Sequence, residues 1–115
     1  MGTIQSSPYP PPKGLIKETA MQTLHIQHSI TDFATWASAF KRFADARSQA
    51  GVRAQRVRRP VDDPNYVVID LDFETTDEAT AFRRFLEANV WGAEGSAPAR
   101  VGSPETMILE PVVME

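Results

Sequence analysis

The chain contains no cysteine among its 115 residues. Disulfide bonds, thiolate metal sites and a cysteine nucleophile are therefore excluded. No apolar run approaches the roughly 20 residues that span a bilayer, and residues 1–19 lack the charged start and apolar stretch of a secretory signal. We therefore expect a cytoplasmic protein that does not associate with membranes.

Histidine and specialised loops are also scarce. Two histidines without cysteine are too few for a zinc site, which usually takes three or four protein ligands, so we expect no metal. The sequence shows no glycine-rich phosphate loop, serine nucleophile elbow or EF-hand loop. A net charge of −3 disfavours nucleic-acid binding. The basic residues between positions 41 and 59 divide between a helix and both faces of a strand, so we expect no nucleic-acid partner.

The remaining composition is that of a globular domain, with 42% hydrophobic and 23% charged residues. Residues 1–19 differ, because four prolines lie between positions 8 and 12 and favour extended chain. We predict a flexible, proline-rich N-terminal arm over residues 1–19. The alternative is an arm that lies across the body or a partner subunit. Residues 20–115 are predicted to form one domain.

Hydrophobic periodicity predicts four strands and two helices in this domain. The predicted strands cover residues 21–30, 52–59, 66–74 and 105–110. The helices are expected to begin at Asp32 and Thr75, which are preferred N-cap types, and the first to end at Gly51. An irregular loop is expected over residues 91–103, which hold three glycines.

The order β-α-β-β-α-β is that of the ferredoxin-like fold. We therefore predict an α+β domain in which a four-stranded antiparallel sheet carries both helices on one face. Alternation along residues 21–30 directs Leu24 and Ile26 toward the helices and His25 and Gln27 away from them. We call the face without helices the open face.

Polar residues of three predicted strands converge on the open face. A hairpin centred near Asp63 places Arg56 opposite Asp70, where we expect a cross-strand ion pair, and the first strand adds His25. One interpretation is a catalytic site. In that site His25 is the general base, Asp70 orients His25, and Arg56 holds an anionic oxygen of the substrate. The alternative is a set of ion pairs that allows a polar sheet face to be buried between two subunits.

Three further residues are candidates for substrate binding. Gln27 and Tyr66 share the open-face parity, and Trp91 stands at the head of the predicted loop. Trp36 lies in the apolar stripe of the first helix, which favours a core position. His28 has the opposite parity from His25 and is expected to pack beside the first helix turn.

Three segments resemble a known family. The stretch His28-Ser29-Ile30-Thr31-Asp32-Phe33-Ala34-Thr35-Trp36 resembles the entry into the first helix of small dimeric α/β-barrel proteins. Residues 62–68 resemble their Asp-Asp-Pro-Asn hairpin, and residues 74–82 resemble their acidic start to the second helix. These proteins are similar to the antibiotic-biosynthesis monooxygenase-like superfamily, and the resemblance spans about residues 21–112.

The resemblance implies a homodimer whose sheets pack by their open faces, a dimeric α/β barrel. It further implies a bound small molecule and a cofactor-independent monooxygenase or cyclase acting on an aromatic or polyketide-like compound. Haem-degrading members use a histidine of the second helix, and residues 79–90 contain none. The alternative is a non-catalytic structural or ligand-binding dimer whose cavity is filled by its own side chains.

Overall fold

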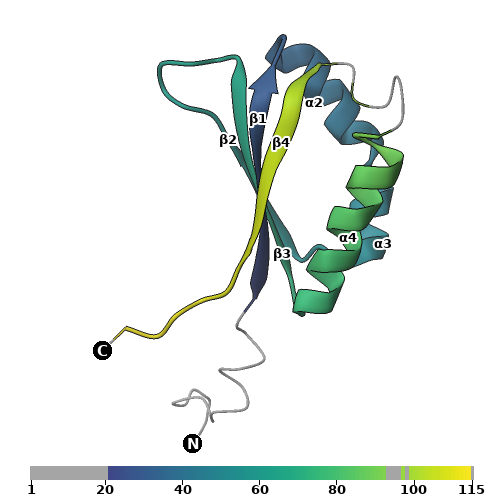
Figure 1. The fold of residues 1–115 in the computed structure, drawn as a ribbon, viewed down its shortest axis with the longest axis vertical. Helices are drawn as coiled ribbons and strands as arrows, with labels where there is room; N and C mark the ends of the chain where they lie inside the picture. Colours follow the sequence, from purple (N-terminus) through teal and green to yellow (C-terminus); the bar gives the residue numbers. More distant parts are fainter. Residues whose placement is uncertain (1–20, 93–96, 98, 115) are drawn as a thin grey trace, which may run out of the picture.

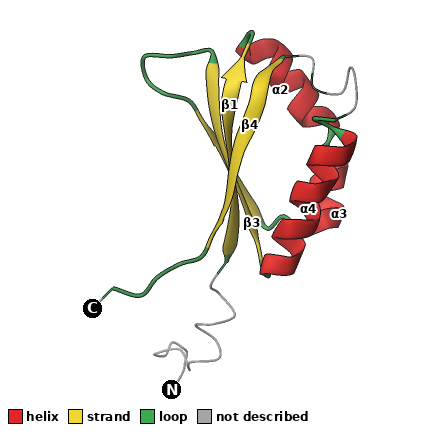
Figure 2. Cartoon of the chain, viewed as in Figure 1, coloured by secondary structure: helices red, strands yellow, loops and turns green. Residues whose placement is uncertain are grey.

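The computed structural model describes residues 21–92, 97 and 99–114 (Figure 1). The elements follow in the order β1 (Gln22–Ile30), α2 (Phe33–Arg42), α3 (Ala44–Ala50), β2 (Ala54–Arg58), β3 (Tyr66–Phe73), α4 (Thr76–Asn89) and β4 (Arg100–Leu109). The antiparallel sheet has the strand order β2-β3-β1-β4, and the helices lie together on one side of it (Figure 2). The predicted ferredoxin-like architecture is thus confirmed. The predicted arm over residues 1–19 lies outside the described residues.

The predicted helix boundaries rest on local hydrogen bonds. The Asp32 carboxylate accepts the backbone N–H of Thr35 at 2.8 Å, and the Thr75 hydroxyl accepts that of Glu78 at 3.0 Å. Gly51 ends α3 in the left-handed conformation, with φ of 102°. The first helix, predicted as one, is broken at Phe43, whose N–H bonds to the Phe40 carbonyl three residues back. That tighter bond separates α2 from α3.

The last strand was predicted too short. β4 begins at Arg100, inside the predicted loop, and not at Glu105. Its register against β1 shifts, since Gln27 pairs with Glu105 whereas Ser29 pairs with Val101. The bulge contains Gly102, one of the three glycines that indicated a loop, and this residue has a φ of 72°.

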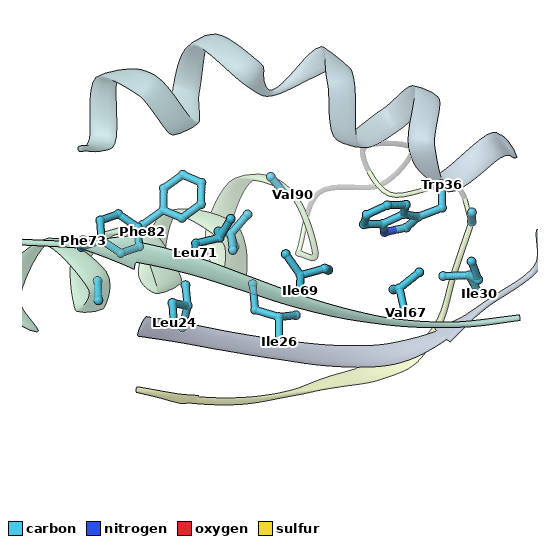
Figure 3. Packing of buried hydrophobic residues seen from close by; sticks show 13 residues of the cluster. Leu24, Ile26, Ile30, Trp36, Val67, Ile69, Leu71, Phe73, Phe82 and Val90 are labelled. Atoms are coloured by element: carbon cyan, nitrogen blue, oxygen red, sulfur yellow. The ribbon is translucent and has the colours of Figure 1, made fainter. Parts of the chain in front are cut away.

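The core lies between the sheet and the helices (Figure 3). Its largest fully buried side chains come from β1 and β3: Phe73, Leu24, Leu71 and Val67. Helices α2 and α4 cover them with Trp36, Phe82 and Leu86, and the predicted core position of Trp36 is confirmed. Among the described residues, no helix is long and apolar enough to cross a membrane.

Candidate functional site

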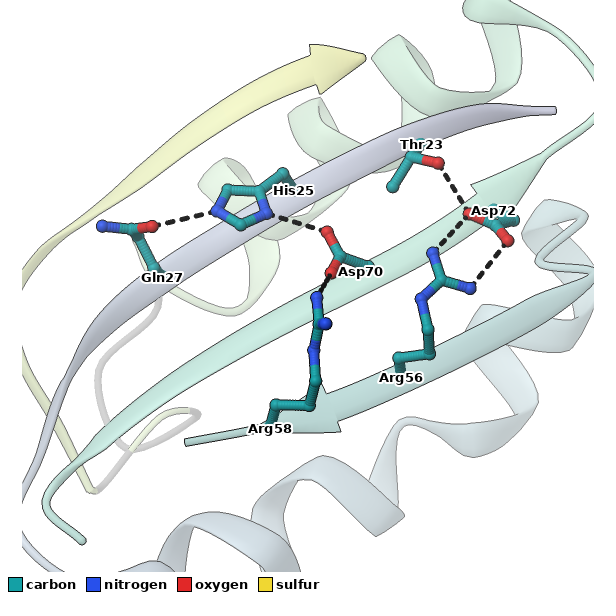
Figure 4. A network of polar contacts seen from close by, with 7 residues as sticks. All are labelled: Thr23, His25, Gln27, Arg56, Arg58, Asp70 and Asp72. Carbon is teal, nitrogen blue, oxygen red and sulfur yellow. Dashed lines mark hydrogen bonds and ion pairs between the residues drawn. The ribbon is translucent and has the colours of Figure 1, made fainter. Parts of the chain in front are cut away.

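A network of hydrogen bonds and ion pairs occupies the open face (Figure 4). Asp70 of β3 is its centre and is only 5% exposed. One carboxylate oxygen lies 2.8 Å from Nδ1 of His25, and the other accepts Nη2 of Arg58 at 2.6 Å. The structure thus brings His25 and Asp70 into direct contact, as the parity of their strands predicted.

Both ring nitrogens of His25 face acceptors. Nδ1 meets Asp70, and Nε2 lies 2.9 Å from Oε1 of Gln27. Burial alone would lower the pKa of His25, but the bonds to Gln27 and Asp70, together with the Asp70 charge, outweigh it and raise the pKa above 6.5. With two acceptors, this position suits the imidazolium form. In that form His25 has no free lone pair with which to accept a proton.

The predicted contact between Arg56 and Asp70 is wrong at the level of side chains. The backbone register is as expected, since Arg56 pairs with Asp70 across the strands. The guanidinium, however, reaches the diagonal neighbour Asp72 and makes two bonds of 3.0 Å. Long side chains bridge such diagonals readily, and Arg58 occupies the remaining oxygen of Asp70. The Asp72 carboxylate, also bonded to Thr23 at 2.7 Å, has a pKa lowered chiefly by Arg56.

The three residues predicted to bind substrate do not lie together. Gln27 and Tyr66 meet on the open face, where the Gln27 amide donates to the Tyr66 hydroxyl at 2.9 Å. The same amide donates to Glu105 at 3.3 Å. Trp91 is absent from this face and lines a cavity on the helix side of the sheet. The polar network and Trp91 therefore belong to two different sites.

We call this second site the helix-side cavity. It has a volume of about 60 Å³ and is predominantly apolar. Five aromatic rings surround it. They come from α2, from the junction after it, from α4 and from the segment after α4: Trp36, Phe40, Phe43, Phe82 and Trp91. Two polar side chains also line it, His28 of β1 and Arg47 of α3.

His28 is the buried histidine of the pair, at 5% exposure. Nδ1 lies 2.9 Å from the Ser29 carbonyl oxygen, an acceptor, so it carries the proton in the neutral ring. Burial, with a smaller effect of Arg100, lowers the pKa of His28 below 6.5. The imidazole is therefore neutral near pH 7 and keeps the lone pair of Nε2.

Arg47 is buried as well, and burial lowers its pKa. Nε donates to Gln55 at 3.0 Å and Nη1 to the Phe40 carbonyl at 2.5 Å. The guanidinium carbon sits 3.6 Å from the centre of the Phe40 ring, a cation–π distance. Nη2 makes no hydrogen bond to any described residue, so it can serve a ligand.

The sequence contained signals for both residues. His28 has the parity of the buried residues of β1, and Arg47 continues the apolar stripe of the first helix at helical spacing. A polar residue at an apolar position is a sign of a buried polar site. Within the described part of the chain, no three His, Asp or Glu residues gather closely enough to hold a metal ion.

Comparisons with known proteins identify the fold. No family model and no curated protein matches the chain. Solved structures do match. A dimeric ferredoxin-like protein from an uncultured marine organism is 15% identical with a TM-score of 0.58, over 84% of this chain and 98% of that one. SnoaB, a cofactor-independent oxygenase from Streptomyces nogalater, is 18% identical with a TM-score of 0.54, over 84% and 100%. The monooxygenase ActVA-Orf6 of Streptomyces coelicolor, in complex with Nanaomycin D, is 15% identical with a TM-score of 0.53, over 84% and 91%.

The chain has the fold of these proteins. The resemblance inferred from the sequence is confirmed at this level, since structural neighbours are antibiotic-biosynthesis-monooxygenase-like and dimeric ferredoxin-like proteins. At such identities the match shows the fold alone, and activity has to be argued from the site.

Proposed function

We propose that the chain is a homodimeric α/β-barrel protein that binds an aromatic or polyketide-like compound in the helix-side cavity and oxygenates or cyclises it without a cofactor. The observation that carries this proposal is a neutral imidazole, His28, and a guanidinium, Arg47, in one aromatic-lined cavity. The neighbours described as dimeric, and those described as a monooxygenase and a cofactor-independent oxygenase, support it.

The chemistry follows from the two polar groups. Nε2 of His28 accepts the proton of an acidic phenol or enol. Arg47 stabilises the resulting oxyanion through its remaining N–H groups. The electron-rich anion then reacts with dioxygen at a CH2 carbon of the substrate to form a C–O bond and, with one proton, a hydroperoxide. The O–O bond breaks as the remaining hydrogen of that carbon is lost, so that one oxygen atom stays as a carbonyl and the other leaves as water with the two hydrogens. The aromatic rings hold the planar substrate and exclude solvent, while the substrate supplies the electrons.

The size of the cavity sets a condition on the ligand. Its volume of about 60 Å³ is well below the roughly 300 Å³ of a usual ligand pocket, so a polycyclic ligand has to displace side chains. Phe43, at the break between α2 and α3, and Trp91 are the lining residues outside regular elements. The small volume favours the alternative function, a non-catalytic dimer with a filled cavity.

For the open-face network we propose a role in assembly. His25, Asp70, Arg56 and their partners neutralise one another's charges, which allows a polar sheet face to be buried against a second subunit. The competing role, with His25 as the catalytic base, requires a free ring nitrogen. The bonds of His25 to Asp70 and Gln27 use both nitrogens, so the geometry supports the assembly role.

The experiment uses 1,8-dihydroxyanthrone, a phenolic ketone whose enol carries an acidic hydroxyl, as the probe. The two tryptophans of the chain, Trp36 and Trp91, both line the helix-side cavity, so their fluorescence reports binding there. Consumption of dioxygen reports turnover. We expect fluorescence quenching that saturates and dioxygen uptake above the uncatalysed rate.

Variants of the two histidines locate the site. His28→Gln is expected to abolish turnover, whereas His25→Gln is expected to retain the quenching by the probe. Loss of turnover in His25→Gln with an intact dimer, and its retention in His28→Gln, would move the site to the open face. Absence of both quenching and turnover in the wild-type dimer would favour the non-catalytic alternative.

A further inference from the structure

The side chains of the open face form three rows that cross all four strands of the sheet. The register from β2 through β3 and β1 to β4 gives these rows: Arg58, Val68, Gln27 and Glu105; Arg56, Asp70, His25 and Met107; Ala54, Asp72, Thr23 and Leu109. Positive charge therefore lies at the β2 border. The β4 border carries one carboxylate and two large apolar side chains.

At both borders a single chain leaves charged and apolar side chains exposed. The Arg58 side chain is 64% exposed and uses one nitrogen, bonded to Asp70. Glu105 is exposed and accepts one long bond, from Gln27. Met107 and Leu109 are 51% and 42% exposed, and the exposed apolar residues Val112–Met114 follow them along the chain. Figure 1 shows this last segment running away from the body of the protein.

A second copy of the chain fits this pattern. In a two-fold dimer with face-to-face sheets, the axis lies between the sheets, and its two limiting directions are along and across the strands. An axis across the strands places β2 over β2, so that the arginines of one copy, Arg56 and Arg58, approach those of the other. An axis along the strands keeps each row at its level and reverses its order, so that β2 lies over β4.

We propose that two copies pack by their open faces about an axis parallel to the strands, so that Arg58 of each subunit pairs with Glu105 of the partner subunit. This inference rests on the homodimer of the proposed function and defines its geometry. In the same arrangement Ala54 lies over Leu109 of the partner subunit. Asp70 lies over His25 of the partner subunit, so each copy completes the other's charged network.

Charge complementarity decides between the two axes. Like charges that are brought together at an interface strongly disfavour association. The axis across the strands gathers the arginines of both copies into one cluster at the β2 border, whereas the axis along the strands creates two Arg58–Glu105 pairs. Within one chain these two side chains stand three strand spacings apart, about 14 Å, so a coupling between them has to arise between subunits.

The test is a charge swap with the dimer dissociation constant measured by sedimentation velocity. Arg58→Glu and Glu105→Arg are each expected to weaken the dimer by roughly tenfold or more. The double variant is expected to return to within about threefold of wild type, because the pair is restored with its charges exchanged. The control exchange, Arg56→Glu with Glu105→Arg, is expected to give no rescue, since Arg56 lies opposite Met107.

Because Arg58→Glu also faces Asp70, a second measurement guards against a folding defect. The chain has no cysteine, so single thiols can be introduced and joined by a short bis-maleimide. The combination Ala54→Cys with Leu109→Cys is expected to give crosslinked dimers. Ala54→Cys alone is expected to stay uncrosslinked, since an axis along the strands separates the two copies of this residue.

The outcomes separate this inference from the proposed function. Crosslinking of Ala54→Cys alone, or a swapped double variant as weak as the summed single variants, would overturn the axis while leaving the dimer. A wild-type chain that sediments as a monomer at micromolar concentration would overturn both. Failure of ligand binding in a dimer that passes the swap test would overturn the ligand site alone.

Discussion

His25 and His28 lie three residues apart on β1 and face opposite sides of the sheet. His25 contacts the carboxylate of Asp70 on the open face, whereas His28 is buried beside the aromatic cavity and bonds to a backbone carbonyl. One environment stabilises the imidazolium, and the other stabilises the neutral ring. A single strand thus holds two imidazoles whose pKa values are moved in opposite directions from 6.5.

The first prediction concerns these two rings in solution. The chain has two histidines, so NMR should show two ring titrations. We expect the midpoint of His25 above 6.5 and that of His28 below it. His25→Gln and His28→Gln assign the signals, since each removes one of them. Two midpoints on the same side of 6.5 would contradict the geometry at one of the rings.

The second prediction concerns stability against pH. The pKa of His25 is raised on folding, so its stabilising effect is complete below 6.5 and is lost as the pH rises through the raised value. The pKa of His28 is lowered, so its effect is complete above 6.5 and is lost as the pH falls below that value. Urea titrations at fixed protein concentration should show that His25→Gln flattens the alkaline side of the profile and His28→Gln the acidic side.

The third prediction concerns the buried arginine. Arg47→Met removes the bonds to Gln55 and to the Phe40 carbonyl, and it should lower the free energy of unfolding by about 1–3 kcal/mol. Arg42→Met, on the exposed side of α2, is the matched control and should stay within about 0.5 kcal/mol of wild type. Equal effects of the two variants would show that the Arg47 contacts contribute nothing to stability.

The fourth prediction compares two phenylalanines. Phe73 is fully buried, and Phe73→Ala should cost about 3–5 kcal/mol in a reversible denaturant titration. Phe40 is partly buried, stacks on Trp36 at a centroid distance of 4.9 Å and borders a cavity. Phe40→Ala should therefore cost less than Phe73→Ala. The reverse order would mean that Phe40 contributes more to the stability of the core than its partial exposure indicates.

Alternation and capping residues were sufficient to predict the architecture. The parity of His25 and Asp70 placed them together on one face, because side chains alternate strictly along a strand. The turn between Asp62 and Asn65 set the backbone register that brings Arg56 opposite Asp70. These features depend on neighbours in the sequence or on period-two geometry, both of which are visible in a single chain.

Side-chain partners and the helix-side cavity could not be predicted in this way. Arg56 has both Asp70 and Asp72 within reach, and the choice depends on Arg58, which competes for Asp70. The cavity is lined both by Phe43, at the break between α2 and α3, and by Trp91, which is far away in the sequence. Periodicity predicts neither which arginine binds which carboxylate nor where packing leaves a cavity. The burial of Arg47 was indicated only by its position, since a charged residue stands there at the helical spacing of the apolar residues.

The borders of the sheet restrict how copies can add to one another. Pro104 lies within β4, which is an edge strand, and offers no N–H for pairing with another chain. The bulge beside it twists the ladder, and the short opposite edge β2 is rich in arginine. Open-ended growth by strand addition is thereby disfavoured at both borders. A single copy of the chain consequently lacks the continuous, flat edge from which amyloid-like fibres are seeded.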